Sequence, residues 1–316
     1  MTGATGFIGS HLCEELARRG HQVTCLVREN SDLKWIENID SRIIVGDCTK
    51  IESLYNAVDG IDYIFHLAGV TKACSEYEFF CANADGTKNL ITATLKNNPK
   101  LKRFIYISSL AAVGPSKNGS PVKEDTEPHP VSSYGRSKLE GEKAVLNYKE
   151  KLPITVIRPS AVYGPRDRDL FVFFKMLKKG IFPYWGKCYY SLVYVDDLIQ
   201  GIILAAENKE AEGKIYFVSD SKFYTNDEIV KAISSALGVK ALRLKIPKFF
   251  MPFFAYIGEI VDRKGIINRD KMVELSYSHW ICDTTKAKEE LGFIPKVRIK
   301  EGMKWTADWY RIHRWL

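Results

Sequence analysis

The stretch TGATGFIGSHL, residues 2–12, decides the fold, because three glycines spaced three apart lead directly into a helical pattern. Gly3 permits a tight turn from strand to helix, Gly6 lets the backbone approach a pyrophosphate, and Gly9 lets the helix pack on the strand. The N–H groups at the start of the helix would then face the anion. A glycine turn that binds nothing remains the alternative for this stretch alone.

Apolar runs and helical patterns alternate through the first half of the chain. Buried strands are indicated by apolar runs at 21–28, 42–47, 61–69, 102–109 and 153–164, and helices are predicted over 7–20, 50–58, 76–98 and 131–150. This alternation predicts βαβ units and a parallel sheet with helices on both faces. The first run ends at the charged Arg28 and the second in GDC, residues 46–48, and both ends favour a nucleotide site beside the glycines.

The pattern loosens after about residue 165, where aromatic residues and prolines become frequent. We therefore predict a dinucleotide-binding domain over residues 1–165 and mainly a smaller substrate-binding lobe over residues 166–316. The boundary stays open, because YFVSD, residues 216–220, could be a strand that returns to the main sheet.

Only Met1 and Thr2 stand before the glycine loop. A central strand normally precedes such a loop, and a sheet without that strand would expose hydrogen-bonding edges. We therefore expect the natural start of the chain to lie upstream, with Met1 at a strand position.

The composition excludes several classes of protein. The chain has 316 residues, a net charge of +8 and seven scattered cysteines, with no stretch of 18 apolar residues and no secretory signal. The dispersed basic residues fit a soluble basic enzyme, and attraction to phosphate-bearing ligands is the alternative. We predict reduced thiols, a cytoplasmic location and no nucleic-acid partner. Neither the cysteines nor the six histidines have the spacing of metal ligands, so we predict no metal site.

Tyr134 and Lys138 lie four residues apart in a predicted helix, and therefore on one face of it. A free phenol has a pKa of about 10, which is too high for acid–base work at neutral pH. A nearby ammonium group, or the positive ring of a nicotinamide, would stabilise the phenolate and lower that pKa. Taken alone, the two residues could equally be a chance pair on a wet surface.

Taken together, the motifs resemble those of a known family. They are TGATGFIGSHL (2–12), HLAG (66–69), ISS (107–109), YGRSK (134–138), IRPSAVYGP (157–165), YVDDL (194–198) and DTTKAKEELGFIP (283–295). In this order they resemble the extended short-chain dehydrogenase/reductases, the NAD-dependent epimerase/dehydratase group, from Thr2 to about Gly302. The resemblance implies an α/β fold, namely a Rossmann-type doubly wound parallel sheet with a smaller C-terminal α/β substrate lobe. It also implies a bound nicotinamide dinucleotide, a small-molecule substrate and a homodimer.

The resemblance implies roles for residues that match the family's motifs. Ser109, Tyr134 and Lys138 would be catalytic; Ser108 is the competing choice, but Ser109 lies five residues before Gly114, as the family's spacing requires. The cofactor-binding residues would be Gly3, Gly6, Phe7, Ile8, Gly9, Arg28, Asp47, Cys48, Leu67, Ala68, Gly69, Tyr134, Lys138 and Pro159.

The end of the second predicted strand bears on the choice of cofactor. NAD-preferring members tend to carry an acid there, which accepts hydrogen bonds from the ribose 2′-OH. This chain has Arg28, whose guanidinium suits a 2′-phosphate, followed by Glu29. We predict NADP, with NAD as the alternative and a solvated Arg28 as the competing explanation.

Missing groups narrow the reaction. Leu110 and Ala111 stand where sugar dehydratases of this family carry an acid pair, so we do not expect dehydration. Ala161 and Tyr190 stand where nucleotide-sugar members carry an Asn and an Arg that contact the substrate. An arginine of GPRDRD, residues 164–169, could replace those contacts.

The second half of the chain is rich in aromatic side chains. Most would form the core of the lobe, and some could line an apolar pocket. They are Phe182, Tyr184, Trp185, Tyr189, Tyr190, Phe249, Phe250, Phe253, Phe254 and Tyr256. With SSLAAVGP, residues 108–115, this pattern resembles the hydroxysteroid dehydrogenase and dihydroflavonol reductase branch. That branch implies an oxidoreductase acting on a secondary alcohol or ketone of an apolar substrate.

Three alternatives stay open. A nucleotide-sugar 4-epimerase with tightly bound NAD needs only the same Ser, Tyr and Lys. A dinucleotide sensor without turnover would keep the fold, although Tyr134 and Lys138 are intact. Peripheral membrane attachment could use the aromatic and basic residues of 248–261 and 305–316, with lobe packing or a dimer contact as the competing explanation. We predict no firm membrane association.

Four polar residues outside the catalytic set are predicted to have supporting roles. We expect His66 to be packed in the core and Asn83 to support the site through a water molecule or a backbone contact. Asp196 and Asp197 are expected to brace the second lobe.

Overall fold

The computed structural model describes residues 1–247 and 269–316. Its central sheet is parallel and has the order β2, β1, β3, β4, β5, β9, with β1 and β3 joined through Thr2. The strands are β1 (Val23–Val27), β2 (Ser41–Val45), β3 (Tyr63–His66), β4 (Arg103–Ile107), β5 (Ile154–Pro159) and β9 (Lys214–Val218). The strand order runs outwards in both directions from Thr2, as in a doubly wound Rossmann-type fold, and confirms the predicted fold class.

Thr2 joins the two halves of this sheet. It forms parallel bridges with Leu26 of β1 and His66 of β3. The Leu26 N–H donates to the Met1 carbonyl at 2.9 Å, and the Thr2 N–H donates to the Phe65 carbonyl at 3.0 Å. Met1 and Thr2 therefore occupy the central strand position directly before the glycine loop.

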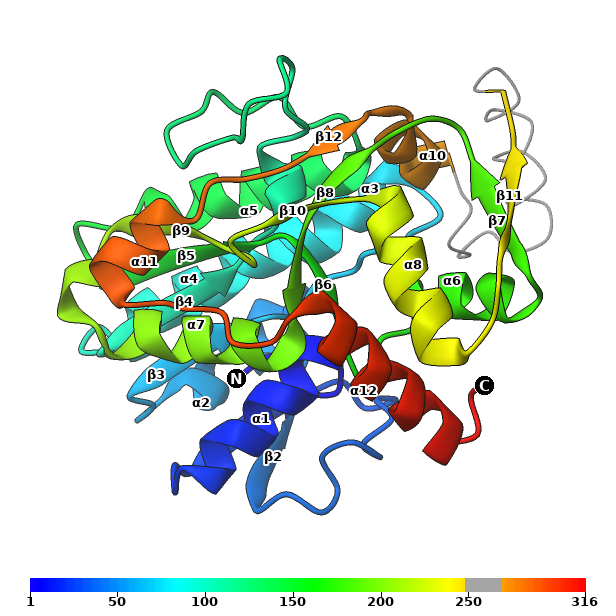
Figure 1. Cartoon of the computed structure of the whole chain (residues 1–316). Coiled ribbons are helices and arrows are strands. Elements are labelled where there is room, and N and C mark those ends of the chain that lie inside the picture. Colours follow the sequence, from blue (N-terminus) through cyan, green and yellow to red (C-terminus); the bar gives the residue numbers. More distant parts are fainter. Residues whose placement is uncertain (248–268) are drawn as a thin grey trace.

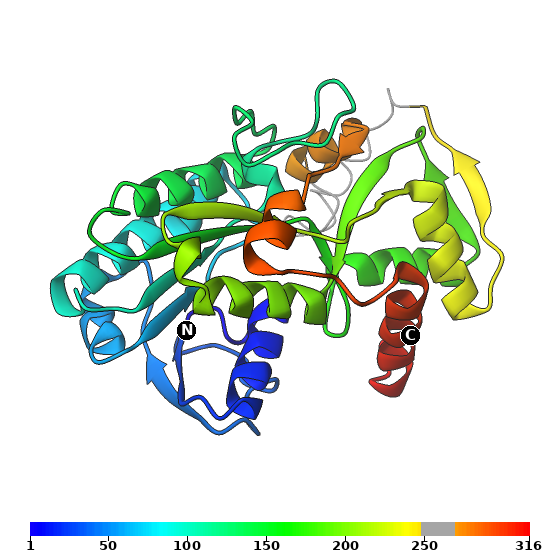
Figure 2. The ribbon, with the colours of Figure 1, turned by 60° about the vertical axis from the view of Figure 1, so that its left-hand side comes forward.

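Helices cover both faces of the sheet (Figure 2). One face carries α2 (Tyr55–Val58), α3 (Glu76–Phe80), α4 (Gly86–Asn97) and α5 (Ser133–Leu146), and the other carries α1 (Phe7–Arg18), α7 (Val195–Glu207) and α11 (Thr285–Leu291). Strand β4 shows the effect, because Phe104 and Tyr106 pack into one core while Ile105 and Ile107 pack into the other. A strand with alternating side chains and two covered faces must be apolar throughout, as this run is.

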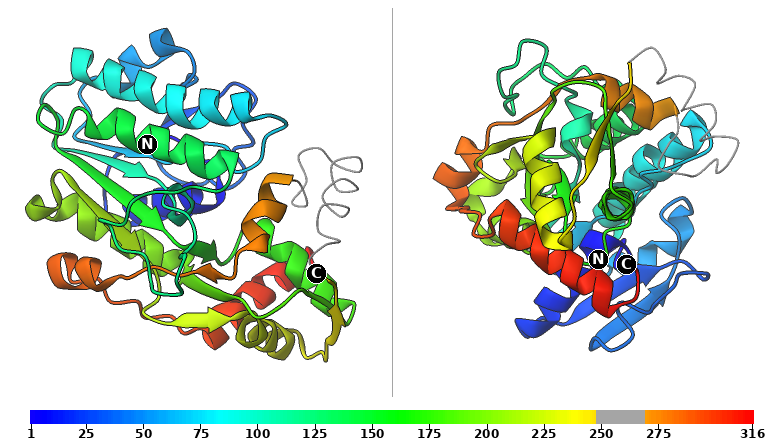
Figure 3. Two further views of the ribbon diagram at one scale, coloured as in Figure 1. Left: turned by 90° about the horizontal axis from the view of Figure 1, so that it is seen from above. Right: turned by 45° about the vertical axis from the view of Figure 1, so that its right-hand side comes forward.

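The second lobe is built around β8 (Figure 1). Its mixed sheet joins β8 (Tyr189–Tyr194) to β6 (Ala161–Tyr163), β10 (Phe223–Thr225) and β12 (His279–Trp280), and a separate parallel pair joins β7 (Ile181–Tyr184) to β11 (Leu242–Lys245). Its helices are α6 (Asp169–Lys178), α8 (Asn226–Leu237), α10 (Arg269–Ser276) and α12 (Ile299–Ile312). Helix α12 lies beside α8 (Figure 3, right), so much of the aromatic tail at 305–316 packs within this lobe.

Two predicted helices are divided in the structure, and the one over 50–58 consists of a 3-10 turn at Ile51–Ser53 and α2. The helix expected over 76–98 is divided into α3, a π-helical turn at Cys81–Asp85 and α4. Short 3-10 turns also occur at Ile51–Ser53, Leu110–Ala112 and Lys209–Ala211. The possible returning strand in 216–220 is confirmed, because β9 pairs with β5 in the main sheet.

Several absences concern only the part of the chain that the structure describes. Within residues 1–247 and 269–316, no helix is long and apolar enough to cross a membrane, and no three His, Cys, Asp or Glu side chains are grouped as metal ligands. All seven cysteines fall in these ranges and are free thiols. Phe249, Phe250, Phe253, Phe254 and Tyr256 lie outside the described residues, as does the whole predicted membrane-contact segment at 248–261.

Candidate functional site

The predicted cofactor residues gather at one edge of the central sheet. Parallel strands end at the same edge, so segments far apart in sequence meet there. The segments are Arg28 after β1, Asp47 and Cys48 after β2, Leu67 to Gly69 after β3, Ser108 and Ser109 after β4, and Pro159 at the end of β5.

The glycine loop leaves no room for larger side chains. Gly3 has a φ of +72°, and a Cβ at this position would lie 2.7 Å from the backbone nitrogen of Ala68. A Cβ at Gly9 would lie 2.0 Å from the Gly3 carbonyl oxygen. The first glycine therefore makes the turn, and the third allows close packing of α1 on that turn.

Phe7 and Ile8 form the first turn of α1, directly after the loop. Gly6 caps the helix without a side chain, so no side-chain acceptor covers these first N–H groups. A helix start of this kind can bind the pyrophosphate of a dinucleotide.

Arg28 and the Asp47–Cys48 turn lie close together on the adenosine side of the predicted site. The Arg28 N–H donates to Ser31 Oγ at 3.1 Å, which fixes the turn and leaves the exposed guanidinium in solvent. Burial and Asp47 raise the pKa of the Cys48 thiol to about 12, while the positive charge of Arg28 lowers it. The Asp47 carboxylate accepts the Thr49 N–H at 2.8 Å, so part of it is used within its own turn.

His66 connects the glycine loop to the nicotinamide side of the site. Its Nδ1 lies 2.7 Å from Thr2 Oγ1, and its Nε2 lies 2.8 Å from Thr87 Oγ1. Thr2 Oγ1 accepts the Ala68 N–H, and Thr87 Oγ1 donates to the Asn83 carbonyl, so the neutral ring must carry its proton on Nε2. Burial lowers the pKa of His66 to about 3. The prediction of a packed core histidine is confirmed.

Asn83 stands in the π-helical turn and holds the loop after β3. Its Oδ1 accepts the Val70 N–H at 2.7 Å, and its Nδ2 donates to the Val70 carbonyl at 3.0 Å and to Ser137 Oγ at 2.9 Å. A Cβ at Gly69 would lie 2.7 Å from Asn83 Oδ1. The expected backbone contact is confirmed, and it explains why Gly69 must be small.

Helix α5 presents Tyr134 and Lys138 on the face that packs toward the sheet. Lys138 is 4% exposed, and its Nζ donates to the Ile107 carbonyl at 2.7 Å and lies 4.4 Å from the centroid of the Tyr106 ring. Burial lowers the pKa of Lys138 to about 7, while Glu142 raises it.

In the protein alone, the pKa of the Tyr134 phenol shifts upwards, and the lowering predicted for the complex with a nicotinamide dinucleotide stays a prediction. Burial raises the pKa of the Tyr134 phenol to about 12, and a hydrogen bond with Ser109 opposes this rise. The nearby charges come from the second lobe, where Glu274 raises the pKa and Lys271 lowers it. Desolvation is therefore the main effect of the protein on the pKa of this phenol.

The two neighbouring serines have different partners. Ser109 is bonded to Tyr134, whereas Ser108 is 5% exposed and donates to the Glu142 carboxylate. Glu142 also forms a buried ion pair with Arg158, at 2.6 Å between Oε2 and Nη2. This geometry favours Ser109 over Ser108 as the residue that faces the substrate.

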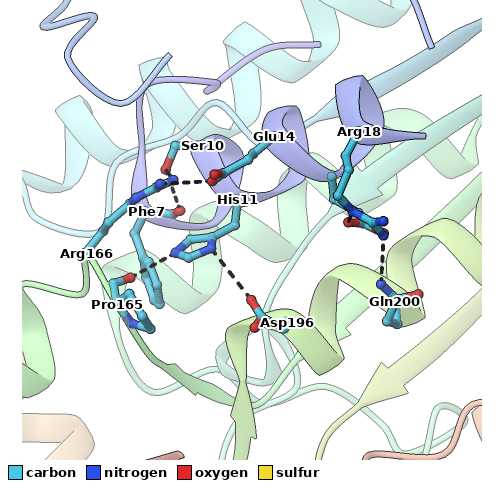
Figure 4. Close-up of polar contacts among 10 residues, drawn as sticks. Phe7, Ser10, His11, Glu14, Arg18, Pro165, Arg166, Asp196 and Gln200 are labelled. Carbon is cyan, nitrogen blue, oxygen red and sulfur yellow. Dashed lines mark hydrogen bonds and ion pairs between the residues drawn. The ribbon is translucent and has the colours of Figure 1, made fainter. Parts of the chain in front are cut away.

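Of the two arginines that could have replaced the missing nucleotide-sugar contacts, Arg166 is bonded to α1 and Arg168 is exposed. Arg166 donates to Ser10 Oγ at 3.1 Å and pairs with Glu14 at 2.9 Å, both on α1 (Figure 4). The Arg168 guanidinium lies 5.9 Å from the centroid of the Trp315 ring. The hypothesis that they compensate for Ala161 and Tyr190 has no support in these contacts.

The same region ties α1 to the second half of the chain. His11 Nε2 lies 3.0 Å from the Pro165 carbonyl oxygen, and its Nδ1 lies 3.7 Å from Asp196 Oδ1 (Figure 4). Asp197 accepts the Val297 N–H at 2.9 Å. The predicted bracing role is confirmed for Asp197, whereas the Asp196 side chain is 63% exposed and its bracing role stays a prediction.

Charged residues near Tyr134 were missed by sequence reasoning. Lys72, in the loop after β3, pairs with Asp169 of α6 at 2.5 Å. Lys271 of α10 pairs with Glu274 at 2.8 Å. These residues lie in three separate parts of the chain, and no local motif marks them.

Comparisons with known proteins agree with this geometry. The family model "NAD dependent epimerase/dehydratase family" matches residues 1–219. A 3-beta-hydroxysteroid dehydrogenase of Mycolicibacterium neoaurum is 29% identical, covering 98% of this chain and 90% of its own. A UDP-glucose 4-epimerase of Vibrio cholerae is 26% identical, covering 98% and 94%.

A solved structure supports the fold. The UDP-glucose 4-epimerase of Thermotoga maritima, crystallised with UDP-glucose, superposes with a TM-score of 0.83 at 24% identity over 99% of this chain and 98% of its own. With a family model that spans more than half of its length, this chain belongs to the NAD-dependent epimerase/dehydratase family of extended short-chain dehydrogenase/reductase enzymes.

Proposed function

We propose that the protein is an NAD(P)-dependent oxidoreductase that interconverts a secondary alcohol and a ketone, with Tyr134 as the acid and base. One observation carries the proposal: Tyr134 and Lys138 lie one turn apart on α5, and the Lys138 Nζ donates to the Ile107 carbonyl at 2.7 Å, at the end of the strand that leads into Ser109. A nicotinamide dinucleotide, when bound, would supply the hydride chemistry.

The chain's own residues would bind, orient and exchange a proton. The glycine loop and the first turn of α1 would hold the pyrophosphate, and Ser109 would donate a hydrogen bond to the substrate oxygen. Because its pKa in the protein alone is about 12, the Tyr134 phenol is protonated at neutral pH and suited to protonating a carbonyl oxygen during reduction. Alcohol oxidation would need further positive charge near the phenol to lower that pKa.

NADP is the proposed cofactor, and NAD is the alternative. The Arg28 guanidinium is exposed at the end of β1, and its positive charge lowers the pKa of the Cys48 thiol, which follows β2. This position supports two parallel hydrogen bonds from the guanidinium to a 2′-phosphate. Glu29 is also exposed and could accept hydrogen bonds from an unphosphorylated ribose.

The proposed substrate is apolar. Ala161 and Tyr190 supply no charge for a diphosphate, and Arg166 is held by Glu14 and Ser10 of α1. A nucleotide-sugar 4-epimerase with retained NAD is the second candidate, supported by the name of the Vibrio cholerae relative. A homodimer in the cytoplasm remains an expectation from the family resemblance and the free thiols, and light scattering would test the dimer.

Identification of the dinucleotide that co-purifies, followed by single turnover, tests the proposal. Native mass spectrometry should find a bound dinucleotide, and bound NADPH should be oxidised by members of a panel of apolar ketones. Tyr134→Phe should keep its affinity for the dinucleotide and lose turnover by at least about 100-fold.

The other outcomes separate the alternatives. Full activity of Tyr134→Phe would overturn the assignment of the acid and base. Tightly held NAD with interconversion of UDP-glucose and UDP-galactose would favour the epimerase. Dinucleotide binding without turnover of either substrate class would favour a sensor.

A further inference from the structure

The start of α5, the helix that carries Tyr134, is held by a helix from the other lobe. Asp270 of α10 accepts the Ser133 N–H at 2.6 Å through Oδ1 and the Tyr134 N–H at 3.1 Å through Oδ2. Glu274, one turn further along α10, accepts a hydrogen bond from Ser132 Oγ at 2.8 Å. Asp270 and Tyr134 are 136 residues apart in sequence, so this contact belongs to the tertiary structure alone.

The first turn of a helix has backbone N–H groups without partners inside the helix. In α5, the capping residue Ser132 accepts only the Gly135 N–H, at 3.0 Å. The two preceding N–H groups, of Ser133 and Tyr134, are the ones that Asp270 accepts. Ser132 and the Asp270 carboxylate therefore accept different N–H groups of the first turn. A carboxylate is the favoured group at this end of a helix.

Helix α10 is itself fixed at this position. The Trp280 indole donates to the Glu274 carbonyl at 2.9 Å, and Lys271 pairs with the Glu274 carboxylate, which is 12% exposed. Met272 packs against Trp185. A carboxylate that is held from its own side can fix the direction of the bonds that it accepts.

The charges of α10 also reach the phenol. Among the charges near Tyr134, Glu274 raises the pKa of the phenol and Lys271 lowers it. Helix α10 therefore contacts the backbone of Tyr134 and also affects the pKa of its phenol.

We propose that Asp270 and Glu274 are positioning residues, which set the place and orientation of Tyr134 from the substrate-binding lobe. The inference rests on the proposed role of Tyr134 as acid and base. It adds that the catalytic tyrosine is ordered by contacts that only the assembled pair of lobes can make.

Hydrogen exchange tests the backbone part without any substrate. In Asp270→Ala, the amides of Ser133 and Tyr134 should exchange about tenfold faster or more, because they lose charged acceptors. Asp270→Asn should restore part of the protection, since its amide oxygen can accept one of the two bonds. Glu140→Gln is the matched control: Glu140 is an exposed acid on the same helix that pairs with Lys143 at 2.7 Å, and its loss should leave these amides unchanged.

Titration of the phenol tests the electrostatic part. The ultraviolet difference between each variant and the same variant carrying Tyr134→Phe isolates the phenolate of Tyr134. Its midpoint should fall in Glu274→Gln, because a negative charge beside the phenol is removed. It should stay in place in Glu140→Gln.

Kinetics with a ketone that the enzyme reduces complete the test. Asp270→Ala should lower kcat while the KM for the dinucleotide stays unchanged, whereas a general loss of structure would affect both. Unchanged amide exchange in Asp270→Ala, or an unchanged phenol midpoint in Glu274→Gln, would overturn the inference. Both of those readouts stand even if no substrate is turned over, so they separate this inference from the proposed function.

Discussion

The ammonium group of Lys138 donates a hydrogen bond of 2.7 Å to the carbonyl oxygen of Ile107, the last residue of β4. The lysine thus binds the strand that leads into Ser108 and Ser109, and its charge lies over the Tyr106 ring. Burial at this place lowers the pKa of Lys138 to about 7.

A lowered lysine pKa makes the stability of the protein depend on pH. Between pH 7 and about 10.4 the unfolded chain keeps a proton that the folded chain has lost, so the free energy of unfolding rises with pH in this range. Below pH 7 both states are protonated and the full cost of burying the charge remains. The free energy of unfolding of the wild type, minus that of Lys138→Met, should therefore rise by roughly 2–3 kcal/mol from pH 6 to pH 9.

Urea unfolding of the dinucleotide-free protein at several pH values measures this difference. Lys143→Met is the control, because Lys143 lies on the same helix with its side chain 58% exposed, and it should show no such dependence. A flat profile for Lys138→Met would mean that the ammonium group is not desolvated.

The buried pair of Glu142 and Arg158 should be important for stability. Their side chains are 1% and 3% exposed, and Ser108 also donates to the Glu142 carboxylate. Glu142→Gln leaves a buried guanidinium without its counter-charge, which should lower the free energy of unfolding by about 3–5 kcal/mol. Glu140→Gln, with its side chain 45% exposed, should cost less than about 0.5 kcal/mol in the same urea titration. Equal losses in the two variants would contradict this account.

Ser109 and Ser108 should differ in what their loss affects. Ser109→Ala removes the hydrogen bond that opposes the rise in the Tyr134 pKa, so this pKa should increase and kcat should fall by about 100-fold. Ser108→Ala should leave kcat within a few-fold and lower the free energy of unfolding by about 1–3 kcal/mol, because a buried carboxylate loses a donor. Steady-state kinetics and thermal unfolding of both variants distinguish the roles, and a larger kcat loss in Ser108→Ala would reverse the assignment.

Arg28→Ala should change the preference between cofactors. Loss of a charged contact with the 2′-phosphate should raise the KM for NADPH by about 10–100-fold and leave the KM for NADH nearly unchanged. Glu29→Gln is the neighbouring control and should act in the opposite way, weakening NADH more than NADPH. Equal changes in the KM for NADPH and the KM for NADH in Arg28→Ala would show that the guanidinium does not bind the 2′-phosphate.

The fold and the cofactor edge followed from the sequence because their signals are local. The glycines at 3, 6 and 9 are required by backbone contacts shorter than a Cβ allows, and the apolar runs mark strands buried on both faces. Parallel strands then bring the following loops to one edge, which is where the structure places Arg28, Asp47 and Ser109.

What the sequence did not predict depends on burial and on long-range contacts. Tyr134 and Lys138 have the right spacing, but spacing carries no information about desolvation, which sets the direction of both pKa shifts. The π-helical turn that places Asn83 is read as ordinary helix from its residues. The carboxylate of Asp270 contacts the start of α5, 137 residues away in sequence, and no pattern in residues 269–276 marks it.

The position of β9 bears on how such proteins can be divided and recombined. A fragment ending at residue 165 would contain β5 but not β9, which pairs with β5 along Thr155–Pro159, and it would also lack α7, which covers one face of the sheet. Such a fragment would present an unprotected strand edge and would be prone to self-association. Exchange of substrate specificity between relatives by swapping everything after residue 165 should therefore fail, and chimaeras would have to keep residues 195–218 with the N-terminal partner.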